Sequence, residues 1–288
     1  MQDSFKKIST LLAALSLGAF SGQLAAQQDF SNVQITPHQV AGNIYYLEGQ
    51  GGNIGLSVGA DGVVMIDDQF APLTDRILAA IRGLSDGEIR FLINTHIHGD
   101  HTGGNENLGK MGILILARDE VRVRLAANAA PEALPVLTFS EDLTIHLNGE
   151  DMHVISMPPA HTDGDAIIYF SGSDVVHVGD VFRTVAYPVI DLNNGGSLDG
   201  TLETLAMIIG MAGPNTKIVP GHGAVSNRED VRDFRDMVLD VKAKVGALVA
   251  QGRNFDQVMA ARPTAAYDAK WGDPERFLRS VYTEVGGQ

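Results

Sequence analysis

Three histidines and an aspartate lie within one short segment that directly follows an apolar, strand-like run. The segment is Thr95–His101, with the sequence THIHGDH, and the run before it spans Arg90–Asn94. Imidazole nitrogens and carboxylate oxygens are the ligands that a hydrolytic zinc ion prefers. A purely structural role is disfavoured, because desolvating four such groups without a metal is costly. The cluster therefore predicts a metal site on a loop at the end of a strand.

Three further segments repeat this layout, in which a strand ends and a possible ligand follows. The turn-rich segment 158–165 contains His161. The apolar run 175–179 ends in the carboxylate of Asp180, and the run 218–219 is followed by His222 between two glycines. A rigid sheet presents loop residues to a metal in this way. We expect the four loops to meet at one site.

The chain contains two strand-rich blocks with helical segments attached to each. Short apolar runs between Gly, Asn and Asp predict strands, and apolar residues at helical spacing predict helices. The expected strands are 44–47, 54–58, 63–66, 91–94 and 113–116 in the first block, and 143–147, 152–157, 166–170, 175–178 and 217–219 in the second. The expected helices are 73–84, 118–127, 201–211, 228–251, 255–261 and 274–285. Two such halves predict an α/β fold with four layers, in which helices cover two facing sheets.

In sequence order, the candidate ligands resemble the metal-binding pattern of the metallo-β-lactamase superfamily. The pattern is His-x-His-x-Asp-His at 96–101, followed by His161, Asp180 and His222. The strand that ends at Asp67 and the Gly-Gly-Asn at 103–105 also match. The resemblance extends over residues 44–223 and implies a four-layer αββα sandwich of the metallo-β-lactamase type (α/β, or α+β in some schemes). We expect one catalytic domain over residues 27–288.

The resemblance also implies how the ligands divide between two Zn²⁺ ions per chain, with iron or mixed metals as alternatives. The first metal would be held by His96, His98 and His161, and the second by Asp100, His101 and His222, with Asp180 bridging both. Two such cations bring the pKa of a shared water down toward about 7 and create a metal-bridging hydroxide as the nucleophile. Asp100 is the candidate catalytic residue that orients this water and moves its proton.

Within the superfamily, the ligand set resembles that of glyoxalase II, a thioester hydrolase. The broad-spectrum lactamase subclass has Arg in place of His101 and Cys in place of Asp180. Two other positions nevertheless resemble lactamase substrate contacts: Arg183, as the cation that binds a substrate carboxylate, and Asn194, as an amide donor in the segment Asn-Asn-Gly-Gly. The plainer alternatives are a surface salt bridge for Arg183 and an ordinary turn for Asn194.

The first 26 residues predict a cleaved signal peptide and a periplasmic or secreted protein. Lys6 and Lys7 precede an apolar segment at 11–20 that is too short to span a bilayer, and a short anchor or tail is the alternative. Without cysteine, the chain contains no disulfide and no thiolate ligand.

The formal net charge of −14 argues against nucleic-acid or anionic-membrane partners, which need a basic face. After signal removal we expect no membrane association, and the sequence gives no indication of the oligomeric state.

These observations predict an exported dinuclear zinc hydrolase that opens a cyclic amide, a β-lactamase-like activity on a carboxylated small molecule. The alternative is a thioesterase or lactonase of glyoxalase II type. Export favours the first, because bulk thioester metabolism is cytosolic. A mononuclear iron persulfide dioxygenase is less favoured, because it would use only a His-His-Asp triad.

Of the remaining side chains, Asp67 is expected to orient a metal-binding imidazole. No motif surrounds four histidines, His38, His146, His153 and His177.

Overall fold

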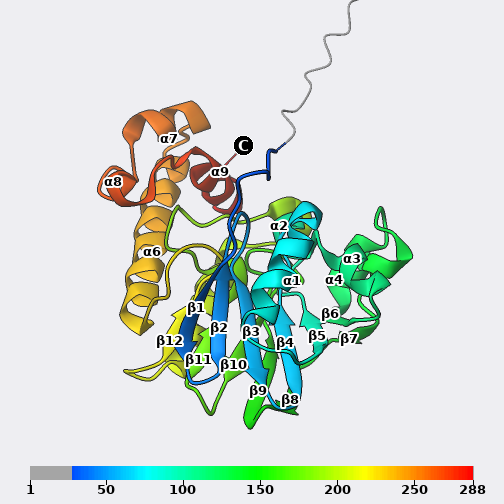
Figure 1. Ribbon diagram of the computed structural model, residues 1–288. Helices are drawn as coiled ribbons and strands as arrows, with labels where there is room; N and C mark the ends of the chain where they lie inside the picture. The colour runs from blue at the N-terminus through cyan, green and yellow to red at the C-terminus, as the bar shows by residue number, and fades with distance from the viewer. Residues whose placement is uncertain (1–27, 288) are drawn as a thin grey trace, which may run out of the picture.

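Short apolar runs separated by turn residues form two β-sheets in the computed structural model, which describes residues 28–287. The first sheet consists, in spatial order, of β1 (Thr36–Ala41), β2 (Ile44–Glu48), β3 (Ile54–Gly59), β4 (Gly62–Ile66), β5 (Ile89–Ile93), β6 (Leu114–Arg118) and β7 (Leu137–Phe139). The second consists of β12 (Lys217–Val219), β11 (Val175–His177), β10 (Ala166–Phe170), β9 (Glu150–Ser156) and β8 (Leu143–Leu147). The two sheets face each other (Figure 1).

Helices cover the outer faces of both sheets (Figure 1). Those near the first sheet are α1 (Thr74–Arg82), α2 (Gly99–Thr102), α3 (Asn105–Lys110) and α4 (Asp119–Leu125). Those that follow the second sheet's strands are α5 (Leu198–Met211), α6 (Arg228–Ala250), α7 (Phe255–Ala261), α8 (Asp268–Trp271) and α9 (Glu275–Glu284). Short 3-10 turns are η1 (Ala71–Leu73), η2 (Pro131–Ala133), η3 (Gly179–Val181) and η4 (Leu192–Asn194).

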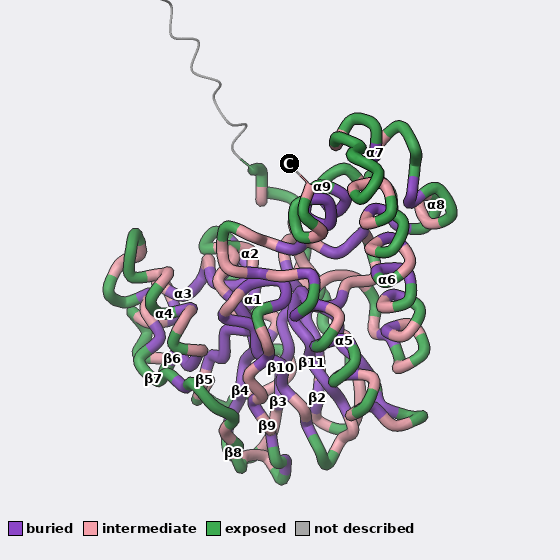
Figure 2. The backbone as a smooth tube through the Cα atoms, turned by 180° about the vertical axis from the view of Figure 1, so that it is seen from behind, coloured by how far each residue is buried: buried purple, intermediate pink, exposed green. Residues whose placement is uncertain are grey.

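Three apolar cores separate the four layers. In β4, Val63 and Met65 pack in the core under α1, whereas Val64 and Ile66 pack in the core between the two sheets. In β10, Ile168 faces the core between the sheets, and its neighbour Ile167 faces the core under α5 and α6. Successive side chains of a strand point to opposite faces, so neighbouring residues reach different cores. Both faces of these central strands are therefore buried (Figure 2). Three cores between four layers confirm the predicted αββα arrangement.

The long helix α6 shows how the outer layer is specified by the sequence. Its side chains at Val231, Phe234, Val238, Val241 and Val245 recur every three or four residues and are all buried. This spacing places them on one face of a helix, which packs against the second sheet. The Asn preceding the helix caps it by accepting hydrogen bonds from the backbone N–H groups of residues 229 and 230.

Strand direction determines where the loops gather. β4, β5, β6 and β7 are parallel neighbours in the first sheet, and β11 and β12 are parallel neighbours in the second. The carboxyl ends of parallel neighbours lie at the same edge of a sheet. The loops after β4 and β5 therefore leave the first sheet at one edge, and those after β11 and β12 leave the second sheet together.

The predicted elements are found with shifted ends, and several short ones were missed. The helix expected over 73–84 is the 3-10 turn η1 followed by α1. The elements missed were β1, β7, α2, α3 and α8. The first two residues of β7 are exposed at the edge of the sheet and only Phe139 is buried, so this three-residue strand is too short to produce an alternating pattern. The predicted signal peptide lies outside the described residues, and no helix within 28–287 is long and apolar enough to cross a membrane.

Candidate metal centre

Four strand-end loops bring the seven predicted metal ligands together. The loops follow β5, β9, β11 and β12, as the sequence layout predicted. Their ligand atoms form three overlapping groups, each within 4.8 Å: His96 with His98 and His161, His96 with His101 and Asp180, and Asp100 with His101 and His222. We call His96, His98 and His161 the first ligand set, and Asp100, His101 and His222 the second ligand set.

Asp180 lies between the two sets and directs one oxygen to each. Its Oδ1 is 3.2 Å from His101 Nε2 and 3.3 Å from His222 Nε2. Its Oδ2 is on the other side, 3.8 Å from His161 Nε2. The second set closes through Asp100, whose Oδ2 is 3.2 Å from His222 Nε2. A carboxylate in this position has an oxygen available for each of two cations.

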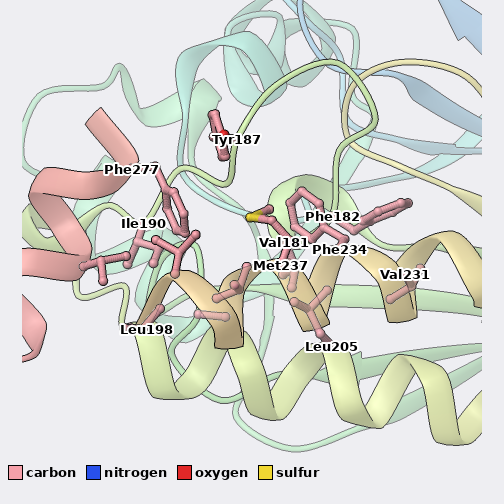
Figure 3. Packing of buried hydrophobic residues seen from close by; sticks show 14 of the residues in the cluster. Val181, Phe182, Tyr187, Ile190, Leu198, Leu205, Val231, Phe234, Met237 and Phe277 are labelled. Atoms are coloured by element: carbon pink, nitrogen blue, oxygen red, sulfur yellow. The ribbon is translucent and has the colours of Figure 1, made fainter. Parts of the chain in front are cut away.

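The loop that contains Asp180 is anchored in the apolar core of the second half. Directly after Asp180, Val181 and Phe182 are buried, and the Phe182 ring meets that of Phe234 in α6 edge to face at 5.2 Å between centroids (Figure 3). Gly221 approaches the carboxylate so closely that a Cβ there would lie 2.0 Å from Asp180 Oδ1. Only glycine fits at this position without displacing the carboxylate.

Four of the imidazoles are held from outside by a protein oxygen. His96 Nδ1 is 3.0 Å from Thr95 Oγ1, and His161 Nδ1 is 2.6 Å from the carbonyl oxygen of residue 189. His101 Nδ1 is 2.7 Å from Asp67 Oδ2, as the sequence predicted for Asp67. His98 Nε2 is 2.7 Å from Asp191 Oδ2, a contact that the sequence did not predict. Such outer partners fix the ring orientation and tautomer of metal-binding histidines.

Some inner atoms of the cluster pair with one another, since His98 Nδ1 and His161 Nε2 lie 2.8 Å apart. His96 Nε2, His101 Nε2 and Asp180 Oδ1 are buried and make no hydrogen bond, although the last two lie 3.2 Å apart. Buried polar atoms are almost always paired, because leaving one without a partner costs about 1–3 kcal/mol. Three such atoms converge on one point here and belong to the residue types that bind zinc. The residues therefore fit a centre of two divalent cations.

The loop between β2 and β3 links the two halves of the site. The backbone N–H of Gly52 donates to the carbonyl of Asp100 at 3.1 Å, and that of Asn53 donates to the carbonyl of Gly221 at 2.7 Å. The Asn53 side chain also donates to the carbonyl of residue 220 at 2.9 Å. A Cβ at Gly52 would lie 2.1 Å from the His101 ring, so this turn requires glycine. This turn thus packs directly against Asp100 and His101 of the second ligand set.

Burial determines the protonation of the first ligand set. Desolvation lowers the pKa of His96 well below its ordinary value and lowers the pKa of His161 to about 4. Both rings are therefore neutral near pH 7, and a metal ion does not have to displace a proton from either.

Carboxylates reverse this effect in the second ligand set. Burial acts to lower the pKa of His101, but Asp180 and Asp67 outweigh it and raise that pKa well above its usual value. Burial likewise opposes, but does not overcome, the close contacts with the carboxylates of Asp100 and Asp180 that raise the pKa of His222. The same contact with His222 outweighs the desolvation of Asp100 and lowers its pKa to about 2, so that carboxylate is ionised at neutral pH.

Acidification is expected to release the metal of the second ligand set before that of the first. Without metal, the second set's imidazoles bind protons more tightly than a free histidine, so its metal must displace protons, and its affinity falls as the pH drops below 7. In the first set, the rings of His96 and His161 stay neutral until the pH approaches the pKa of about 4 of His161, so this set should keep its metal to a lower pH than the second. Metal content after dialysis at stepped pH from 7 to 4 should show two separate losses. Loss of both ions in one step would contradict this assignment.

A cavity of about 440 Å³ opens over the centre. Besides the ligands, it is lined by Phe70, Val189, Arg183 and Arg276. Arg183 Nε is buried without a hydrogen-bond partner, and Arg183 makes no ion pair with any residue of the described chain. The salt-bridge alternative for Arg183 is therefore not what the structure shows. The contribution of Arg276, from α9, was not predicted, because nothing in its local sequence distinguishes it from an exposed helical arginine.

Asn194 occupies a different place from Arg183. It ends η4, is followed by Gly195 in the left-handed region, and is not among the residues that line the cavity. Its side chain donates to Asp191 Oδ2 at 2.8 Å and accepts from Arg124 at 3.1 Å. The segment is thus a turn, and Asn194 contacts the partner of a metal ligand. Asp191 was missed because its only sequence signal is that of a capping residue before a turn.

The remaining histidines lie outside the two sets. His177 is buried, with Nε2 3.1 Å from the Asn53 carbonyl oxygen. At the surface, His38 lies 2.9 Å from a Glu48 oxygen, and His146 and His153 also contact neighbours on adjacent strands. None of them belongs to a possible metal-binding group within the described residues.

The chain is similar to known proteins in both sequence and fold. The family model described as the Metallo-beta-lactamase superfamily matches residues 42–222. Hydroxyacylglutathione hydrolase of Nitrosococcus oceani is 28% identical over 162 residues, which are 54% of this chain and 57% of that protein. This chain thus spans little more than half the length of that curated relative.

Two solved structures show the same fold at low sequence identity. A metallo-beta-lactamase from Pontibacter korlensis aligns with a TM-score of 0.63 at 17% identity, covering 72% of this chain and all of that one. The stereoselective inverting sec-alkylsulfatase Pisa1 from Pseudomonas sp. aligns with a TM-score of 0.72 at 15% identity, covering 88% of this chain and 50% of that one. At this identity the likeness concerns the arrangement of the layers.

Proposed function

This chain belongs to the metallo-β-lactamase superfamily, and from that premise we propose that it is a dinuclear zinc hydrolase acting on the acyl bond of a carboxylated small molecule. The observation that carries the proposal is the position of Asp180, with one oxygen toward each ligand set, beside buried inner atoms that make no hydrogen bond. Two cations bound there would supply a water of lowered pKa as nucleophile and polarise the acyl oxygen of the substrate.

We assign to Asp100 the role of orienting that water. It lines the cavity, and its pKa of about 2 leaves it ionised and able to accept a hydrogen bond at neutral pH. Its contact with His222 holds one of its oxygens, Oδ2, at the second ligand set. Asp100 can therefore accept a hydrogen bond from the nucleophile and orient it.

Arg183 and Arg276 favour an anionic substrate. In a chain of net charge −14, neither arginine has an ion-pair partner among residues 28–287, yet both line the cavity of the metal ligands. A guanidinium with free donors binds a carboxylate through two parallel hydrogen bonds. We therefore place the substrate carboxylate on the Arg183 side of the cavity.

Among acyl substrates, we place a thioester or ester before a cyclic amide. The ligand set with His101 and Asp180 resembles that of glyoxalase II, and the curated relative is named as a hydroxyacylglutathione hydrolase. This reverses the order inferred from the sequence, where export favoured the cyclic amide. Export itself stays a prediction, which the amino-terminal sequence of the mature protein would check.

A substrate panel with metal analysis tests the function. Protein purified without added ions should contain close to two zinc ions per chain and hydrolyse a glutathione thioester faster than a lactone or a chromogenic cephalosporin. A chelator should abolish each activity. The cephalosporin as best substrate would favour the cyclic-amide alternative, and a single iron would favour the oxygenase. Protein that holds two zinc ions and turns over none of the three would contradict the proposal.

Replacing Arg183 by alanine should raise the KM for carboxylated substrates by about 10- to 100-fold. This range corresponds to the loss of a hydrogen bond to a charged group, about 1.5–3 kcal/mol. The KM for neutral esters should change little, because they offer no carboxylate to this side chain. Steady-state kinetics on matched charged and neutral esters measures the difference, with Arg232→Ala, a surface arginine paired with Glu229, as the control. An equal effect on both esters would remove the proposed role.

A further inference from the structure

Arg124 joins two loops that belong to the other half of the molecule. It lies in α4, which packs on β6 and β7 of the first sheet. Its Nε donates to Asp163 Oδ1 at 2.7 Å, its Nη2 contacts Asp163 Oδ2, and its Nη1 donates to Asn194 Oδ1 at 3.1 Å. One guanidinium thus binds both the loop of His161 and the turn η4.

The contacts continue from Asn194 to a metal ligand. The Asn194 side-chain amide donates to Asp191 Oδ2 at 2.8 Å, and the backbone N–H groups of Asn193 and Asn194 donate to Asp191 Oδ1 at 3.1 and 3.2 Å. Asp191 Oδ2 in turn lies 2.7 Å from His98 Nε2. A continuous chain of hydrogen bonds therefore runs from α4 to the first ligand set.

The backbone of the two loops reinforces this chain. Asp163 donates its N–H to the Asn194 carbonyl at 2.9 Å, and Asp191 donates its N–H to the His161 carbonyl at 2.9 Å. Gly195 lies at φ +75°, and a Cβ there would be 2.6 Å from Asp163 Oδ2. The turn can lie directly on Asp163 only because residue 195 has no side chain. The loop of His161 and the turn of Asp191 are therefore held against each other by backbone hydrogen bonds in both directions.

The guanidinium and the Asp191 carboxylate together determine which way the Asn194 amide points. An asparagine side chain has an oxygen that accepts and an NH₂ that donates, and the two differ little in shape. Arg124 offers only donors, so it holds the Asn194 oxygen on its own side and leaves the NH₂ facing Asp191. Without Arg124, nothing would hold the Asn194 oxygen, and the amide would be free to tilt away from the Asp191 carboxylate. That carboxylate would then have a weaker donor and a less fixed position from which to orient His98.

We propose that Arg124 is a positioning residue for the first ligand set, acting through Asn194 and Asp191 on His98. The inference rests on the proposed metal centre. An ordinary surface salt bridge would explain the pair with Asp163, since the two side chains are 28% and 27% exposed. Such a pair contributes about 0–1 kcal/mol to folding and has no reason to change metal affinity. The contact with Asn194 is what extends the effect to the metal.

Replacing Arg124 by methionine should weaken zinc binding at one of two steps by about tenfold, the lower end of what loss of an outer partner costs a metal site. Competition with a chromogenic chelator measures both steps. Asn194→Ala should weaken the same step, and the Arg124→Met change should add little in that background, because both changes break the same chain. Arg122→Met is the matched control: it lies in the same helix and donates to the Pro135 carbonyl instead.

The outcomes separate this inference from the function it rests on. Wild-type protein that binds no zinc would overturn both. Two intact zinc-binding steps in Arg124→Met would overturn the inference alone, as would fully additive effects of Arg124→Met and Asn194→Ala. An equal loss of affinity in Arg122→Met would overturn it too, because the effect would then come from α4 in general. The thermal stability of the metal-free variants should match that of the control within a few degrees, which excludes misfolding as the cause.

Discussion

Replacing Asp180 by asparagine should lower kcat/KM by on the order of 10³-fold, about 4 kcal/mol of transition-state stabilisation, and reduce the bound metal from two ions toward one. Asp180 is the one ligand with an oxygen toward each set, Oδ1 toward His101 and His222 and Oδ2 toward His161. Asparagine keeps the shape but has only one acceptor, and its NH₂ group would point at a cation. Steady-state kinetics and metal analysis on the same preparation measure both effects.

The control for this change is an aspartate of the surface. Asp199→Asn removes an exposed carboxylate of α5 that pairs with Lys242 and does not line the cavity of the metal ligands. It should leave activity and metal content within about twofold of wild type, as most surface substitutions change little. If Asp180→Asn kept two metal ions and more than a tenth of the activity, a bridging role for Asp180 would be wrong.

The convergence of the seven candidate metal ligands could be predicted from the sequence because each lies in a loop that follows a strand. Residues 96–101 come directly after β5, Asp180 follows β11 within three residues, and His222 follows β12 within three. Local spacing of this kind survives in the fold, since parallel strands end at a common edge. Asp67 was predicted for the same reason, because it follows the last residue of β4.

The partners that complete the site could not be predicted, because tertiary packing alone brings them there. Asp191 is 93 positions from the His98 that it contacts, and its segment has only the signature of a turn. Arg276 and Arg124 are charged residues of amphipathic helices, where most charges face solvent. Asn194 was assigned to the substrate from a resemblance, whereas its side chain in the fold faces Asp191 and Arg124.

For the layers of the fold too, the local sequence predicts the strands but not which layer each side chain faces. The apolar run of β4 predicts a strand, and its burial on both faces is compatible with a position in the middle of a sandwich. The pattern does not reveal that Val64 faces the second sheet while Val63 faces α1. The short edge strand β7 was missed because its first two residues are exposed, and pairing with β6 alone defines it.

Removing both metal ions with a chelator should lower the melting temperature by about 10 °C or more. Zinc at about 1,000 times its Kd stabilises a folded site by about 4 kcal/mol, and 1 kcal/mol shifts the melting temperature of a chain of this size by about 2–4 °C. The structural reason is that the metal-free centre leaves His96 Nε2, His101 Nε2 and Asp180 Oδ1 buried without a hydrogen bond. Those atoms lie on loops from both halves, so bound cations would also hold the two halves together. Calorimetry with and without chelator measures the shift.

A variant with only one metal site serves as the control for the shift in melting temperature on metal removal. Asp180→Asn, with one ion left to remove, should show about half the wild-type shift, whereas Asp199→Asn should show all of it. Adding zinc back in excess over the chelator should restore the melting temperature, because the loss is one of ligand binding and not of covalent structure. A wild-type shift below about 2 °C after complete removal of two ions would mean that the loops hold their positions without cations. The buried nitrogens would then need another partner, and the dinuclear centre would no longer explain why four loops converge on these residues.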